Sequence, residues 1–147
     1  MANSIREQIL QTVVGLLEPV ATAQGAQVLR SPTTGVSRER SPALLVFPES
    51  DSITQRPNDR VERALVVRLV ALARQAAGDM PEAIADRLLV AAHAALLGNP
   101  TLNGLCQGLK ELDCEWDVED ADASAASIPA RYQFTYRTLA QDISERG

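Results

Sequence analysis

The sequence predicts an α+β fold, with a small, mostly antiparallel sheet and two main helices packed on one of its faces. Two segments repeat apolar residues at the helical period, and several shorter segments are β-branched or alternate between apolar and polar residues. The expected order along the chain is α, β, β, β, α, β, β. A chain of 147 residues, 46% of them hydrophobic, can bury a core of its own, so we assign residues 1–147 to a single domain.

The first element is expected to be a helix over residues 4–18, with residue 23 as the alternative end. Ser4 and Glu7 have the spacing of a capping box, and an apolar stripe at helical spacing follows them. Pro19 should bend or end the helix, and Gly25 should stop the chain from continuing it.

Three strands and two polar loops are expected next. In chain order they are a short strand at 27–29, a loop at 31–41, a buried strand at 43–47, a loop at 49–59 and a long central strand at 63–74. Pro48 should end the second strand, whereas the third is apolar on both faces, as expected of a strand covered on both sides. Two loops of this length in so small a domain are typical of functional segments.

A second helix follows, in which Asp79 and Glu82 form another capping box, Pro81 occupies the first turn and Gly98 ends the helix. Its buried stripe should contain Ile84, Ala85, Leu88, Leu89, Ala92, Ala95 and Leu96.

Two alternating strands should complete the sheet. Residues 111–119 and 131–139 each alternate with period 2, and we expect them to pair antiparallel across a loop at 120–129. In the first of these strands Leu112 and Cys114 belong to the apolar half, so Cys114 is expected to be buried.

The polar half of residues 111–119 is a run of five carboxylates, the acidic ladder: Glu111, Asp113, Glu115, Asp117 and Glu119. Side chains on one face of a strand are about 6.7 Å apart, so these groups repel one another unless something offsets them. Arg131 and Arg137 on the paired strand could neutralise part of the ladder. Alternatively, the ladder is a functional negative surface that meets a basic partner, or lines a pore through which a polyanion passes. A metal site or a carboxylate-pair hydrolase is disfavoured, because carboxylates on a flat strand do not converge.

Charge is unevenly distributed along the chain. Residues 1–110 carry a net charge of +1 and residues 111–147 a net charge of −6. A net acidic chain is a poor candidate for gripping nucleic acid, since that affinity rests on neutralising phosphates. The arginines of the first half gather in or beside the two loops: Arg30, Arg38, Arg40, Arg56, Arg60 and Arg63. They form either a solvated loop surface or docking points for the acidic faces of neighbouring subunits, which is compatible with head-to-tail ring contacts.

The chemical inventory contains no recognisable catalytic, cofactor-binding or metal-binding motif. The single histidine, His93, lies within the second helix, and the thiols Cys106 and Cys114 are too far apart for a CxxC motif. We therefore expect no enzyme activity, no cofactor and no metal, although an enzyme pairing His93 with either cysteine stays open. The sequence shows neither a signal peptide nor an apolar run of about 20 residues, so secretion and membrane insertion are not expected.

In their order and local sequence, these segments resemble the proteins of a known family. The segments are SIREQILQTVVGLLEPV, PESD, RALVVRLVALAR, MPEAIADRLLVAAHAALL, EWDVEDADA and ARYQFTYRTLAQ. Together, over roughly residues 4–140, they resemble the bacteriophage tail terminator proteins of the minor tail protein U type, found in phages and prophages. The resemblance implies a small sheet with helices, no enzyme activity, and a hexameric ring that caps the tail tube, halts its polymerisation and supports head–tail joining.

The same resemblance implies that the partners are further copies of this chain, the tail tube protein and a head–tail connector protein. DNA would be only a non-adhering cargo in the channel, no membrane would be involved, and the protein would be found in the virion tail and, during assembly, in the host cytoplasm. A small cytoplasmic homo-oligomeric binding module unrelated to phage is the alternative function.

Overall fold

The computed structural model describes residues 2–33, 42–74, 78, 80–115 and 125–147. The elements are, in order, α1 (Ile5–Ala23), β1 (Gln27–Arg30), β2 (Ala43–Gln55), β3 (Arg60–Arg74), α2 (Pro81–Leu97), β4 (Gly108–Cys114) and β5 (Ala125–Leu139). This is the expected order, and the α+β fold class is confirmed.

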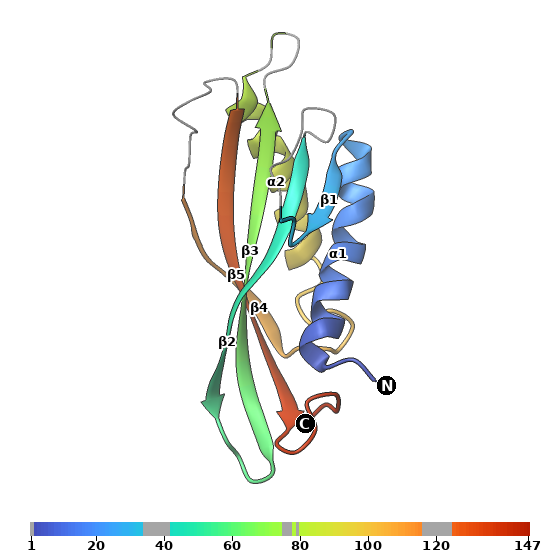
Figure 1. Ribbon diagram of the computed structural model, residues 1–147, viewed down its shortest axis with the longest axis vertical. Helices are drawn as coiled ribbons and strands as arrows, with labels where there is room; N and C mark the ends of the chain where they lie inside the picture. The colour runs from blue at the N-terminus through green and yellow to red at the C-terminus, as the bar shows by residue number, and fades with distance from the viewer. Residues whose placement is uncertain (1, 34–41, 75–77, 79, 116–124) are drawn as a thin grey trace.

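The five strands form one sheet in the order β1-β2-β3-β5-β4, in which β1 and β2 are parallel and every other pair is antiparallel. The expected antiparallel pairing of the last two strands is therefore confirmed. Strands β3 and β5 pair over all 15 residues of β3 with no shift in register. Both helices lie alongside the upper part of the sheet, whereas the β2–β3 hairpin continues beyond them to the lower end of the molecule (Figure 1).

The main core lies between the two helices and the face of the sheet that they cover. Strand β3 contributes every second residue to it, as the alternation predicted: Leu65, Val67, Leu69, Ala71 and Ala73. Strand β5 adds the buried rings of Tyr132, Phe134 and Tyr136. Helix α2 buries Ala85, Leu88, Ala92 and Leu96, while Ile84, Leu89 and Ala95 of the expected stripe are only partly buried. Each fully buried Leu or Phe contributes about 1.5–3 kcal/mol relative to an exposed one, so this layer holds the fold together.

The opposite face of the sheet carries a smaller apolar cluster of Ala43, Leu45, Val70 and Leu72. Phe47 packs against this cluster, and the guanidinium carbon of Arg68 lies 4.8 Å from the centre of its ring. Strand β3 is thus apolar on both faces in its upper half, as predicted for a central strand.

Helix α1 passes through Pro19 and ends at Ala23, so the longer of the two expected ends is correct. Leu17 and Ala21 are buried on either side of Pro19, and this packing outweighs the backbone hydrogen bond that proline removes. The Ser4 side chain accepts a hydrogen bond from the Glu7 backbone N–H, as the capping box predicted.

The Glu7 carboxylate turns away from the cap and binds Arg30 of β1 through two contacts of 2.6 Å. This hydrogen-bonded pair lowers the pKa of the Glu7 carboxyl below its usual value. The side chain that the sequence assigned to a cap therefore ties α1 to the edge of the sheet instead.

The capping box predicted for α2 is wrong. The N-cap is Met80, because Pro81 already occupies the start of the helix. The Met80 side chain makes no capping hydrogen bond. Asp79, the expected cap, lies outside the described residues. Gly98 ends the helix as predicted.

The strands are longer than the sequence predicted. Strand β2 continues through Pro48 to Gln55, so most of the loop expected at 49–59 is strand, and only residues 56–59 connect β2 to β3. Pro48 is accommodated because it lies beside a register shift on a strand whose outer edge has no strand partner beyond Val46 in the described part of the chain. Strands β4 and β5 also begin earlier than expected, at residues 108 and 125.

Leu88 offers a direct test of the helix–sheet core, since only 1% of its surface is exposed. We predict that Leu88→Asp destabilises the fold by at least about 4 kcal/mol, because it removes buried apolar contacts and places an unpaired charge in the core. Chemical denaturation followed by circular dichroism measures the effect. Ala94→Asp, on the exposed side of the same helix, is the control and should remain folded. A stable Leu88→Asp variant would contradict the packing of α2 described above.

Candidate functional site

Strand β4 carries the described part of the acidic ladder, and a β-bulge divides that part between the two faces of the sheet. Glu111 pairs with Tyr132, but Asp113 pairs with Arg131, and the register shifts between them. Tyr132 belongs to the core under the helices, whereas Arg131, the next residue of β5, faces the other way. The expectation that all ladder residues share one face is therefore wrong for Glu111 and Asp113, because a bulge adds a residue and reverses the alternation.

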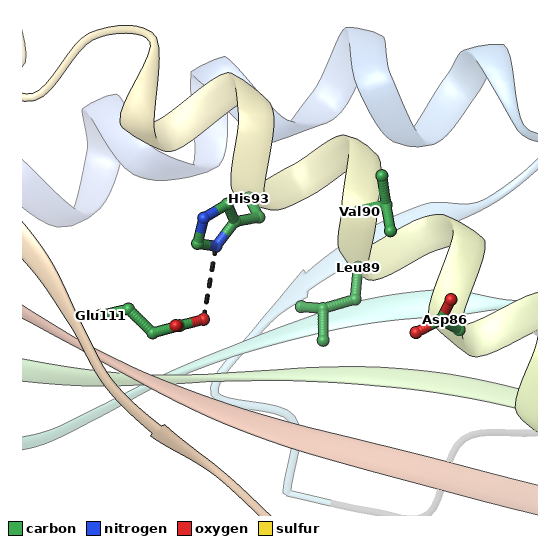
Figure 2. A pocket seen from close by; sticks show the side chains of 5 residues that line it. All are labelled: Asp86, Leu89, Val90, His93 and Glu111. Atoms are coloured by element: carbon green, nitrogen blue, oxygen red, sulfur yellow. Dashed lines mark ion pairs between the residues drawn. The ribbon is translucent and has the colours of Figure 1, made fainter.

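On the helix-covered side, Glu111 meets the single histidine of the chain. Its Oε2 atom lies 3.5 Å from Nδ1 of His93, and the same nitrogen is 2.9 Å from the hydroxyl of Tyr132. Figure 2 shows Glu111 on β4 pointing toward His93 on α2, with Asp86, Leu89 and Val90 along the same helix. These five side chains line a surface groove of about 300 Å³, which we call the α2–β4 groove.

On the other side of the sheet, Arg131 holds two carboxylates. Its Nη1 donates to Asp113 at 2.7 Å and its Nε donates to Glu49 of β2 at 3.0 Å. The hydrogen bond to Asp113 raises the pKa of the Arg131 guanidinium. The expected neutralisation of the ladder by Arg131 is therefore confirmed. The same expectation is wrong for Arg137, which reaches Glu62 of β3 at 3.5 Å.

The remaining ladder residues differ in what the structure says of them. Glu115 is exposed at the end of β4 and helps to line a hollow of about 290 Å³ beside Arg131 and Arg68. Asp117 and Glu119 lie outside the described residues. The role of the ladder as a surface for a partner or a lumen stays a prediction.

The arginines expected in the second loop lie instead at the tip of a projecting hairpin. We call residues 47–63, which comprise the lower part of β2, the turn and the start of β3, the hairpin arm; it forms the lower end of the molecule in Figure 1. Arg56 is exposed and forms no ion pair with any described residue, whereas Arg60 lies 3.3 Å from its neighbour Asp59. Arg38 and Arg40, from the first expected loop, lie outside the described residues.

The tip of the arm also exposes an apolar side chain close to a turn of well-specified backbone conformation. Ile53 has 42% of its surface exposed, which is unusual for a branched aliphatic residue in a strand. Asn58 adopts a left-handed backbone with φ 57°, and the Arg60 N–H donates to the Pro57 carbonyl oxygen at 3.0 Å to close the turn. Asparagine tolerates this conformation better than most residues, so the turn is locally specified.

A buried carboxylate fixes the base of the arm. Asp51 of β2, whose side chain is only 9% exposed, accepts from Nη1 of Arg6 on α1 at 2.9 Å and from the hydroxyl of Tyr136 on β5. Burial, and then Asp51 itself, raises the pKa of Tyr136, which keeps its phenol protonated as a donor. The second oxygen of Asp51 is buried and has no hydrogen-bond partner among the described residues. One carboxylate thus ties the arm to the first helix and to the neighbouring strand.

Neither thiol has the lowered pKa that is typical of an activated nucleophile. Cys106 is buried, its Sγ lies 3.3 Å from the Pro100 carbonyl oxygen, and burial raises its pKa to about 11. Cys114 is exposed, so its expected burial is wrong; the bulge and its place at the end of an edge strand account for the difference. Its pKa is also raised, through partial burial and neighbouring carboxylates, and a raised pKa disfavours the nucleophilic thiolate.

The described residues contain no group of three or more His, Cys, Asp or Glu side chains placed to hold a metal ion. Neither helix of that part of the chain has the length and apolar character needed to cross a bilayer.

Comparison with known proteins gives a likeness at the level of the fold. No protein-family model matches the chain, and no curated protein matches it. Among solved structures, the chain is similar to one from a structure described as "Virion of native gene transfer agent (GTA) particle", with a TM-score of 0.54 and 13% sequence identity. The match covers 90% of this chain and 90% of the other. The likeness therefore extends over almost the entire fold, and at this identity it concerns the fold alone.

The base of the hairpin arm can be tested through Tyr136. We predict that Tyr136→Phe lowers the free energy of unfolding by about 2 kcal/mol, because it removes a donor from a buried carboxylate whose other oxygen has no hydrogen-bond partner among the described residues. Tyr132→Phe is the matched control. It should cost less, because the partner of the Tyr132 hydroxyl, His93, is 40% exposed and can bind water. Equal losses in denaturant unfolding would contradict the role given to Asp51.

Proposed function

We propose that this chain is a structural component of a phage-like particle, and specifically a tail terminator. In this role it forms a ring that caps the tail tube, stops tube polymerisation and supports head–tail joining. The observation that carries the proposal is the shared fold with a chain of a gene transfer agent virion over 90% of both chains. The independent resemblance of the sequence segments to tail terminators supports the same class.

Capping is a matter of surfaces rather than of chemistry. A ring stops growth when one of its faces reproduces the contacts of a tube subunit and the other lacks them. Two features suit such a role: a hairpin arm at one end of the sheet and charged surfaces at separate places on the molecule. The proposed partners are other copies of the chain, in a ring of six by the resemblance, the tail tube protein and a head–tail connector protein.

The acidic ladder has a place in this proposal as a non-adhering wall. DNA that moves through a ring must not bind to its lining, and repulsion between carboxylates and phosphates keeps the passage free. Glu115 supports this role because it is exposed and forms no ion pair with any described residue. Asp113, which Arg131 neutralises, contributes less negative charge to such a wall.

The proposal predicts a closed assembly. Size-exclusion chromatography with light scattering should give one defined oligomer, and negative-stain electron microscopy should show a ring with a central opening. Added to polymerising tail tube protein from the same genome, the protein should shorten the tubes and lie at their ends. A monomer or dimer at every concentration, or tubes of unchanged length, would favour the unrelated binding module instead.

The wall can be tested by reversing its charge. We predict that Glu115→Lys combined with Asp117→Lys leaves the protein folded but makes the assembly retain DNA at low salt, with binding that weakens steeply as salt rises. Mobility shift of duplex DNA over a salt series measures this. Glu18→Lys combined with Glu145→Lys makes the same change in net charge at exposed positions of α1 and the C-terminal segment, and should bind DNA far less. If the Glu115→Lys and Asp117→Lys variant unfolds, these carboxylates are paired within the protein. If both variants bind DNA equally, the ladder has no special role as a non-adhering wall.

A further inference from the structure

The α2–β4 groove combines apolar walls with unneutralised negative charge. Val90 has 63% of its surface exposed, and Leu89 lies beside it, partly buried. Asp86 is exposed and forms no ion pair with the described residues, and Glu111 meets only the weakly placed imidazole of His93 at 3.5 Å. A groove lined by an exposed valine, a half-buried leucine and two carboxylates is a surface suited to a ligand with one apolar and one cationic group.

The tip of the hairpin arm offers that combination. Ile53 is 42% exposed, and Arg56, three residues further on, is an exposed cation that forms no ion pair with the described residues. The turn that carries Arg56 is fixed by the backbone of Asn58, and the base of the arm is fixed by Asp51. A preorganised tip loses little conformational entropy when it docks.

The arm cannot fill the groove of its own chain. The arm forms the lower end of the sheet beside the end of β5, whereas α2 lies against the upper part, on the side that the helices cover (Figure 1). The two surfaces are therefore available to different neighbours at the same time. Such an arrangement joins copies head to tail, and repeated head-to-tail contacts close into a ring when the rotation between copies permits.

We propose that the arm tip of one copy, through Ile53 and Arg56, docks into the α2–β4 groove of the next copy, against Val90, Asp86 and Glu111. This inference rests on the proposed ring and names the contact that builds it. The occupant is a second copy of this chain, because the arm and the groove match in both charge and apolar character.

Charge exchange tests the contact. Arg56→Glu and Asp86→Arg should each weaken assembly about tenfold, since each replaces an exposed ion pair by a repulsion. The double variant, which carries both substitutions, should recover most of the lost assembly, because the two changes together restore an attraction between opposite charges at every contact. Analytical ultracentrifugation over a dilution series measures the assembly constant, and thermal unfolding checks that each variant is folded. Glu18→Arg, at an exposed position of α1, changes the net charge as Asp86→Arg does and should leave assembly unchanged.

Cross-linking tests the direction of the contact. In a Cys114→Ser background, Ile53→Cys and Val90→Cys introduce thiols for a flexible bis-maleimide, while Cys106 is buried and reacts slowly. A mixture of the two single variants should give covalent dimers, and neither should cross-link alone. The chain that carries both introduced cysteines should give cross-linked products of increasing size, the largest of which has the size of the ring. Ile143→Cys paired with Val90→Cys is the control, since Ile143 is similarly exposed at another place.

The outcomes separate the contact from the ring. Two results would overturn the contact and leave the proposed cap intact. In the first, a closed ring forms with an unchanged assembly constant in both charge variants. In the second, a ring forms but the mixture of the Ile53→Cys and Val90→Cys variants cross-links no more than the Ile143→Cys control. Cross-linking by Val90→Cys alone indicates a two-fold contact and also overturns the head-to-tail contact. Arm-to-groove cross-links in open chains of indefinite length support the contact but overturn the ring. A protein that stays monomeric at all concentrations overturns both.

Discussion

The uninterrupted pairing of β3 with β5 is the constraint on which the rest of the structure depends. In the upper half of β3, alternate residues enter the helix-covered core and the smaller cluster on the opposite face. The lower half continues with the same 15-residue register into the hairpin arm, where few side chains are buried. The arm is therefore held by the pairing of β3 with β5 and by the contacts of Asp51 with Arg6 and Tyr136, in addition to the core above it.

The arm is also the part of the fold that the sequence predicted least well. Residues 49–59 are polar and follow a proline, and a local pattern of that kind indicates a loop. Residues 49–55 nevertheless form strand because their partner β3 is held on its other side by β5, so Pro48 and the serines need only follow an existing edge. By contrast, β3, β5 and both helices were predictable, because their apolar period matches the face that each one buries. In the arm, pairing with β3 therefore determines the structure, although the local sequence favours a loop.

The candidate surfaces were predictable in composition but not in geometry. The sequence singled out the carboxylates of β4 and their partner Arg131, and that pair forms at 2.7 Å. The alternation could not reveal that the bulge after Glu111 would separate it from Asp113, since a bulge leaves no mark in an alternating sequence. Nor could it reveal the α2–β4 groove, because Asp86 and Glu111 are 25 positions apart and meet only through the packing of α2 on the sheet.

The separation of these charges also bears on the kind of assembly that the chain can form. A surface dominated by one sign of charge repels a copy of itself across a two-fold axis, so neither the acidic groove nor the tip around Arg56 favours pairing with its own kind. The bulge strengthens this asymmetry, because it sends Asp113 to Arg131 on one face and leaves Glu111 beside the groove on the other. Without the bulge, both carboxylates would face the same side and compete for the same cation. By dividing them, the bulge lets Arg131 neutralise Asp113 on one face and leaves Glu111 in the groove with Asp86 on the other, and in the proposed assembly this favours contacts between unlike surfaces of neighbouring copies.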